Sequence, residues 1–186
     1  MEGEKETGVT VMYMNEGLDT GDIISVEKFP IGDEDDFEAI HDRSAEIGGA
    51  LMSRTLRDIE AGVATRTEQD HSAATYAAKI EKEDCKVDFT KSAKTIDFQI
   101  RGVTPIPGAF AYLNGKMIKI CRATVDSGKG EAGNVISLDG IGDGGIVVAC
   151  GEGAIKITRL KPEGKGVMSA GDFIRGRKIA ENDRFE

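Results

Sequence analysis

Apolar and polar residues follow a strand–loop–strand pattern near the start of the chain. Gly8 to Met14 (GVTVMYM) is β-branched and apolar, which predicts a buried strand. Asn15 to Gly21 (NEGLDTG) is rich in turn residues, and Asp22 to Phe29 resumes a strand pattern before Pro30. We therefore expect two strands joined by a glycine-punctuated loop.

A long helix is predicted after this strand pair. Several residues of Asp33 to Asp36 can cap its first turn, and it should end near Gly62. Its apolar positions follow helical spacing and predict one buried stripe: Phe37, Ile40, Ile47, Leu51 and Ile59. Because two strands and one helix bury too little apolar surface, residues 1–62 are predicted to be part of a larger α/β domain.

A different pattern begins after this helix. Residues 63–77 show no sustained periodicity and predict a linker, whereas Ser92 to Arg101 predicts a short helix. Short apolar runs with turn signals then predict five strands: Ala109–Leu113, Lys116–Ala123, Asn134–Leu138, Gly145–Ala149 and Ala154–Leu160. The dipeptide Asn114–Gly115 is a hairpin signal, so residues 78–186 are predicted to form a small barrel or sandwich.

Charge divides along the same boundary. The 186 residues include 33 acidic and 24 basic side chains, a net charge of −9. Residues 1–64 carry 16 acids and 5 bases, whereas residues 78–186 carry 15 acids and 18 bases. The acidic total argues against a nucleic-acid partner, but the basic second region makes one admissible.

Other features restrict the class of protein. Three cysteines without a Cys-x-x-Cys spacing are typical of reduced thiols, and neither a leader nor a membrane-spanning stretch is recognised, so we expect a cytoplasmic protein without a membrane partner. No histidine pair has metal-binding spacing, and Asp139 to Gly145 lacks the later glutamate of a calcium loop. No metal site is predicted.

The loop from Asn15 to Asp22 holds the candidate chemistry. It places the carboxylates of Glu16, Asp19 and Asp22 directly after a predicted strand. Ligands gather at the carboxyl ends of strands in open α/β sheets, where a carboxylate can orient a histidine or move a proton. The alternative from pattern alone is a solvated acidic turn.

Long motifs in this sequence resemble those of methionyl-tRNA formyltransferases. The resemblance starts with EKETGVTVMYMNEGLDTGDII (Glu4–Ile24) and continues through the acidic helix to the domain junction ATYAAKI (Ala74–Ile80). It then covers, in order, KVDFTKSAKTI (Lys86–Ile96), IRGVTPIPGAF (Ile100–Phe110), VVACGEGAIKI (Val147–Ile157) and LKPEGKGVMSAGDFIRGR (Leu160–Arg177). The last motif favours the tRNA enzymes over other folate-dependent formyltransferases.

The resemblance implies a reaction and a set of site residues. The family transfers the formyl group of 10-formyltetrahydrofolate to the amino group of methionyl initiator tRNA. Asp19 matches the catalytic aspartate, and the residues near the folate are matched by Asn15, Glu16, Gly17 and Leu18. The implied fold is a remnant of a Rossmann-like formyltransferase domain followed by an OB-like β-barrel.

Two further catalytic residues of the family have no counterpart here. The family has an Asn-x-His motif, and neither His41 nor His71 lies in one; both are predicted to be surface groups. The resemblance thus implies a truncated catalytic domain over residues 1–62, a linker over 63–77 and a complete C-terminal domain over 78–186. We expect the chain alone to transfer no formyl group and the full-length form to be monomeric.

Clustered bases of the second region are candidates for tRNA phosphate contacts. They are Lys156, Arg159, Lys161, Lys165, Arg175, Arg177 and Lys178. The alternative for these side chains is a solvated barrel rim. Two alternatives for the whole chain also stay open: a tRNA-binding OB-like module without catalysis, and a folate-dependent formyltransferase acting on an amino sugar.

Overall fold

The chain folds into two compact units. The computed structural model describes residues 1–186, and one unit comprises residues 4–79. The other comprises residues 80–186 together with residues 1–3. Residues 63–77, for which a linker is predicted, therefore belong to the first unit. None of the helices combines the length and the apolar character needed to cross a membrane.

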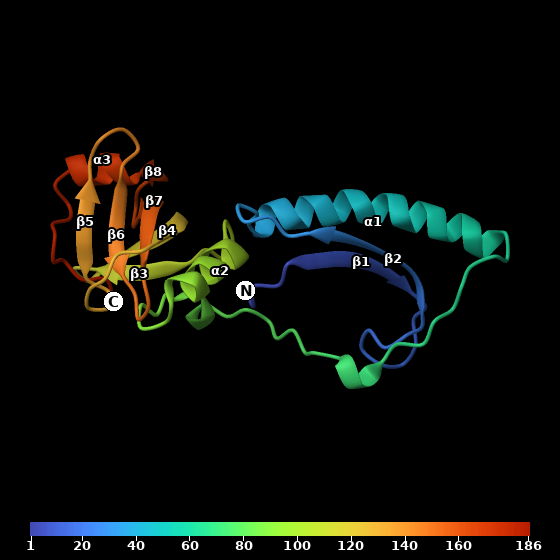
Figure 1. Cartoon of the computed structure of the whole chain (residues 1–186). Helices are drawn as coiled ribbons and strands as arrows, with labels where there is room; N and C mark the ends of the chain where they lie inside the picture. Colours follow the sequence, from blue (N-terminus) through green and yellow to red (C-terminus); the bar gives the residue numbers. More distant parts are fainter. The chain divides into compact units, whose positions relative to one another are not determined.

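The first unit is a β-hairpin with one long helix along it (Figure 1). Strands β1 (Glu6–Met12) and β2 (Ile23–Pro30) pair antiparallel, and α1 spans Phe37–Glu60. Asp36 caps α1 by accepting a hydrogen bond of 3.0 Å from the Ala39 N–H, which satisfies one unpaired donor of the first turn. A short 3₁₀ helix, η1 (His71–Ala73), follows later.

The apolar stripe of α1 is only partly buried. Leu51 is fully buried against Val11 and Ile24, but Phe37 and Ile59 are 47% and 39% exposed. The prediction of one continuous buried stripe is therefore wrong at both ends of the helix. The reason is length: a 24-residue helix is about 36 Å long, whereas strands of seven or eight residues span about 25 Å.

The second unit is built on an antiparallel sheet. Two helical segments precede it, η2 (Glu83–Cys85) and α2 (Ala93–Val103). The strands are β3 (Phe110–Leu113), β4 (Lys116–Asp126), β5 (Val135–Asp139), β6 (Gly145–Ala149), β7 (Ala154–Pro162) and β8 (Met168–Ser169). Their order is β3-β4-β7-β6-β5, with β8 paired to β7, and helix α3 (Ala170–Arg175) follows β8.

Local turn chemistry and helix amphipathicity shape this unit. Asn114 and Gly115 both have positive φ (51° and 74°), as a two-residue type I′ hairpin requires, so the predicted β3–β4 hairpin is confirmed. Helix α2 buries Ile96, Ile100 and Val103, and these three side chains belong to the main hydrophobic cluster of the sheet. The unit thus has a single core between α2 and the strands.

The sheet does not close into a barrel, so the predicted OB-like barrel is not confirmed. Its edge strands β3 and β5 do not pair with each other. Residues 182–186 hydrogen-bond to both edges instead: Tyr112 and Glu186 exchange two backbone hydrogen bonds of 2.8 Å, and the Val135 N–H donates to the Asp183 carbonyl at 2.8 Å. The C-terminal segment therefore covers backbone groups that two sheet edges would otherwise expose.

Candidate active-site loop and basic sheet face

The loop between β1 and β2 has a closed base. The Tyr13 N–H donates a hydrogen bond of 2.9 Å to the Asp22 carbonyl oxygen. Gly21 is buried, and a Cβ atom added there would lie 1.6 Å from the Tyr13 carbonyl oxygen. Only glycine therefore fits at this position, and the close approach of Gly21 to Tyr13 restricts the main chain at the base of the loop.

Asn15 organises the tip of the loop. Its Oδ1 atom accepts hydrogen bonds from the Gly17 N–H at 3.1 Å and from Thr20 Oγ1 at 2.8 Å. Such side-chain turns are typical of asparagine and hold the main chain without secondary structure. Glu16, Gly17 and Leu18 then lie exposed at the tip, with Leu18 77% exposed.

Asp19 lies next to this tip in a left-handed conformation, with φ of 53°. Its backbone carbonyl accepts a hydrogen bond of 2.9 Å from Gln69 Nε2, whereas its exposed carboxylate has no hydrogen-bond or ion-pair partner within the chain. A carboxylate held this way can accept a proton or orient a basic group that approaches it. The geometry is thus compatible with the predicted catalytic role.

Asp22, unlike Asp19, has an ion-pair partner. Its carboxylate pairs with the Arg66 guanidinium, which lies 4.7 Å from the centroid of the Tyr13 ring. The hydrogen bond from Arg66 to Asp22 and the charge of that carboxylate raise the pKa of Arg66. Asp22 is therefore neutralised by its own chain, and the loop presents two unpaired carboxylates, Glu16 and Asp19, instead of the three in the sequence.

Neither histidine lies in the loop. His41 is exposed on α1, where its Nδ1 atom is 3.0 Å from Asp42 Oδ1, and His71 is exposed at the start of η1. Both are surface groups, as predicted. No group of three or more His, Cys, Asp or Glu side chains in the chain is arranged to hold a metal ion.

A basic face covers the pairing of β4 with β7. The register places Lys119 opposite Lys161 and Arg122 opposite Arg159, and Lys156 lies farther along β7, opposite Thr124. Lys119 and Arg122 were not predicted as site residues. The alternation of outward-facing bases on both strands is the sequence signal that could have found them. Which bases face each other across β4 and β7 depends, however, on a register that shifts around Arg122.

Cys121 lies on β4 among these cations. Burial raises the pKa of its thiol, while the charges of Lys119, Lys161 and Arg159 act in the opposite direction. Cys121 is thus a half-buried thiol beside three cations of the same strand pair. We define the basic face as these bases of β4 and β7: Lys119, Arg122, Lys156, Arg159 and Lys161.

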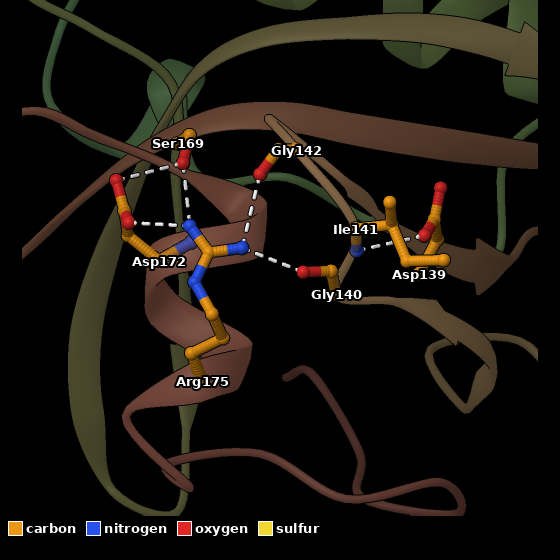
Figure 2. Close-up of polar contacts among 7 residues, drawn as sticks. All are labelled: Asp139, Gly140, Ile141, Gly142, Ser169, Asp172 and Arg175. Atoms are coloured by element: carbon orange, nitrogen blue, oxygen red, sulfur yellow. Dashed lines mark hydrogen bonds and ion pairs between the residues drawn. The ribbon is translucent and has the colours of Figure 1, made fainter.

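The remaining predicted tRNA contacts lie outside the basic face. Lys165 is exposed in the turn after β7, and Arg177 and Lys178 are exposed after α3. Arg175 is held within the unit: its Nη1 atom donates to the carbonyls of Gly140 (2.6 Å) and Gly142 (3.0 Å), as Figure 2 shows. Arg175, which was predicted to contact phosphate, thus has a structural role in this unit.

Arg175 is itself fixed by the cap of α3. Its Nη2 atom donates to Asp172 Oδ1 at 2.6 Å, and Ser169 Oγ donates to Asp172 Oδ2 at 2.9 Å (Figure 2). These two hydrogen bonds lower the pKa of Asp172, that of Ser169 contributing most. We call Ser169, Asp172 and Arg175 the α3 clamp, because Ser169 holds Asp172, Asp172 holds Arg175, and Arg175 binds the loop between β5 and β6.

Both units match known protein families. Residues 1–56 match the formyl transferase family, and residues 79–178 match the family described as formyl transferase, C-terminal domain. The chain belongs to the formyl transferase family. Within it, the similar relatives include methionyl-tRNA formyltransferases: that of Citrifermentans bemidjiense is 41% identical over 177 residues, covering 95% of this chain and 55% of the relative.

A second relative gives the same picture. The methionyl-tRNA formyltransferase of Bradyrhizobium sp. (strain BTAi1) is 41% identical over 189 residues, which cover 100% of this chain and 59% of the relative. The chain thus spans a little over half the length of the curated relatives that it matches.

Several solved structures share the fold. A variant of HypX from Aquifex aeolicus has a TM-score of 0.71 at 22% identity, over 97% of this chain and 32% of HypX. An N-formyltransferase from Helicobacter canadensis, solved with folinic acid and dTDP-3-aminofucose, has a TM-score of 0.64 at 22% identity. The match covers 83% of this chain and 56% of that protein. Methionyl-tRNA formyltransferase from Clostridium thermocellum has a TM-score of 0.54 at 21% identity. The match covers 68% of this chain and 54% of that protein. At such identities these similarities establish the fold alone.

Proposed function

We propose that this chain serves the transfer of a formyl group from 10-formyltetrahydrofolate to the amino group of methionyl initiator tRNA. The observation that carries the proposal is about 41% identity to methionyl-tRNA formyltransferases along nearly the whole chain. In this proposal, residues 1–62 supply the last part of the catalytic domain. Residues 78–186 supply an OB-like tRNA-binding domain, joined by residues 63–77, in a monomeric cytoplasmic protein.

Asp19 is the proposed catalytic residue of the loop. Attack of the amine on the formyl carbon requires a proton to leave the amine and a basic group to be kept in the correct orientation. The Asp19 carboxylate is exposed and unpaired, so it is available to that group. Asn15, Glu16, Gly17 and Leu18 are the proposed folate contacts, and the Asn15 turn holds their main chain in place.

The basic face is the proposed contact for tRNA phosphates. Lys119 faces Lys161, and Arg122 faces Arg159, across an antiparallel strand pair. Cations gathered on one strand pair can neutralise the phosphates of a bound polyanion and release its counterions. Lys165, Arg177 and Lys178 are proposed as further contacts, whereas Arg175 has its Nη1 donors bound to Gly140 and Gly142.

A chimeric enzyme tests the proposed function. Its upstream part is the portion of the C. bemidjiense relative that this chain does not cover, and its downstream part is residues 1–186. We expect the chimera to formylate methionyl initiator tRNA with 10-formyltetrahydrofolate. The chain alone, which contains no Asn-x-His motif, should not. A chimera that formylates only a nucleotide-linked amino sugar would favour the alternative suggested by the Helicobacter canadensis fold.

A further inference from the structure

Residues 64–69 run beside the start of β2 and form a strap within the first unit. The Thr67 N–H donates to the Ile23 carbonyl at 2.9 Å, and the Ile23 N–H donates to the Thr67 carbonyl at 2.8 Å. Thr65 Oγ1 adds a hydrogen bond of 3.0 Å to the Ile24 carbonyl. This segment, predicted to be a linker, is therefore attached like a short third strand to β2.

The strap delivers the side chain of Gln69 to the loop. Gln69 Nε2 donates to the Asp19 carbonyl at 2.9 Å and to the Gly21 carbonyl at 2.6 Å. A primary amide has two N–H donors on one nitrogen, and here both are directed at carbonyls two residues apart. Since Gln69 is half-buried, these hydrogen bonds are partly shielded from competing water.

Other contacts of the chain hold this loop on either side of Asp19. The Asp19 carboxylate has no partner, so within the chain only the main chain, at φ of 53°, sets the direction of its Cα–Cβ bond. Gly21 is fixed by close approach to Tyr13, and Arg66 of the strap binds Asp22. Gln69 therefore joins the main chain of Asp19 to the fixed end of the loop at Gly21.

We propose that Gln69 is a positioning residue that holds Asp19 in its productive orientation for formyl transfer. This inference rests on the proposed function, because it assigns Asp19 its role there. The amide is the required group: a glutamate of the same shape is acceptor-only when ionised and repels both carbonyls. Gln69→Glu should therefore be at least as harmful as Gln69→Ala, although it changes the side-chain volume far less.

The contact itself is tested on the 186-residue chain by NMR. We expect the carbonyl ¹³C signals of Asp19 and Gly21 to shift in Gln69→Glu and in Gln69→Ala, while carbonyl signals of helix α1 stay in place. The double variant Glu68→Gln/Gln69→Glu keeps the net charge and should show the same shifts, since Glu68 is exposed. Unchanged Asp19 and Gly21 signals would overturn the contact.

The positioning role is tested in the chimeric enzyme described above. Gln69→Glu should lower kcat on the order of 10- to 100-fold and leave KM for the tRNA unchanged, because a misdirected catalytic group slows the chemical step without removing tRNA contacts. Full kcat in a variant whose carbonyl signals have shifted would refute the role. A wild-type chimera without any transfer would refute the proposed function instead, and the NMR result would still decide on the contact.

Discussion

Arg175 Nη1 donates a hydrogen bond of 2.6 Å to the carbonyl oxygen of Gly140, a residue 35 positions earlier in the chain. The hydrogen bond joins helix α3 to the loop between β5 and β6 (Figure 2). Lysine cannot replace this planar group, because its ammonium is a single point that cannot match two carbonyls and Asp172 in one geometry. Arg175 is accordingly a structural residue of the second unit.

The first prediction concerns this α3 clamp. In Arg175→Lys and Arg175→Ala, the Gly171 amide, which donates to the Asp143 carbonyl at 2.7 Å, should exchange with solvent faster. We expect about a tenfold increase, the effect of losing about one net hydrogen bond. Hydrogen exchange followed by mass spectrometry or NMR measures it. Lys178→Ala, at an exposed position, is the control, and equal exchange in all four proteins would contradict the clamp.

The second prediction concerns the C-terminal segment. Phe185 is 1% exposed and lies against Phe89, with ring centroids 5.8 Å apart. Phe185→Ala should lower the free energy of unfolding of the second unit by about 3–5 kcal/mol, the usual cost of such a cavity. Urea denaturation measures the loss. Ile141→Ala, at a side chain that is 86% exposed, should change stability by less than about 0.5 kcal/mol.

Helix and strand positions were predictable because periodicity and turn residues are local. The hairpin at Asn114–Gly115 and the strand Gly145–Ala149 were placed correctly, and α1 begins immediately after its predicted caps. The sheet edges covered by residues 182–186 could not be predicted, since those hydrogen bonds join segments far apart in sequence. Helix α3 was missed because its six residues are too few to show a helical period.

The sequence motif proposes Asp19 as the catalytic residue of the loop, and that role stays a prediction. The side chains that support the loop could not be predicted, because Gln69 and Arg66 lie in a stretch whose composition predicts a linker. Arg175 shows the same limit, since a basic residue near other bases predicts an anion contact. Its carbonyl acceptors, Gly140 and Gly142, come close only in the folded chain.

The third prediction concerns pH and Cys150. Burial raises the pKa of this thiol from an ordinary value of 9.0 to about 11. Between these pH values the unfolded chain loses the proton and the folded chain keeps it, so stability falls as pH rises from 9 towards 11. Cys150→Ala should weaken this fall. Thermal or urea unfolding at pH 8, 9 and 10 tests it, and identical pH profiles of the two proteins would contradict the assignment.

The fourth prediction concerns the basic face. The logarithm of tRNA affinity should fall linearly with the logarithm of salt concentration, because bound phosphates release counterions. Arg159→Gln/Lys161→Gln should reduce the steepness by up to about 0.9 for each duplex phosphate that the variant no longer neutralises. Arg175→Gln should leave it unchanged, as its Nη1 donors bind the chain. Filter binding at several salt concentrations measures the slopes, and equal slopes for wild type and the double variant would argue against the face.

The most direct test of the central claim is the formylation rate of the chimeric enzyme with Asp19→Asn. The substitution keeps the shape of the side chain and removes the charge that is proposed to orient the basic group, so single-turnover formylation of methionyl initiator tRNA should fall by about 100-fold or more. Glu46→Gln, at an exposed position on α1, removes one charge elsewhere and should leave the rate unchanged. A rate for Asp19→Asn equal to that of Glu46→Gln would contradict the claim that this loop carries the catalytic aspartate.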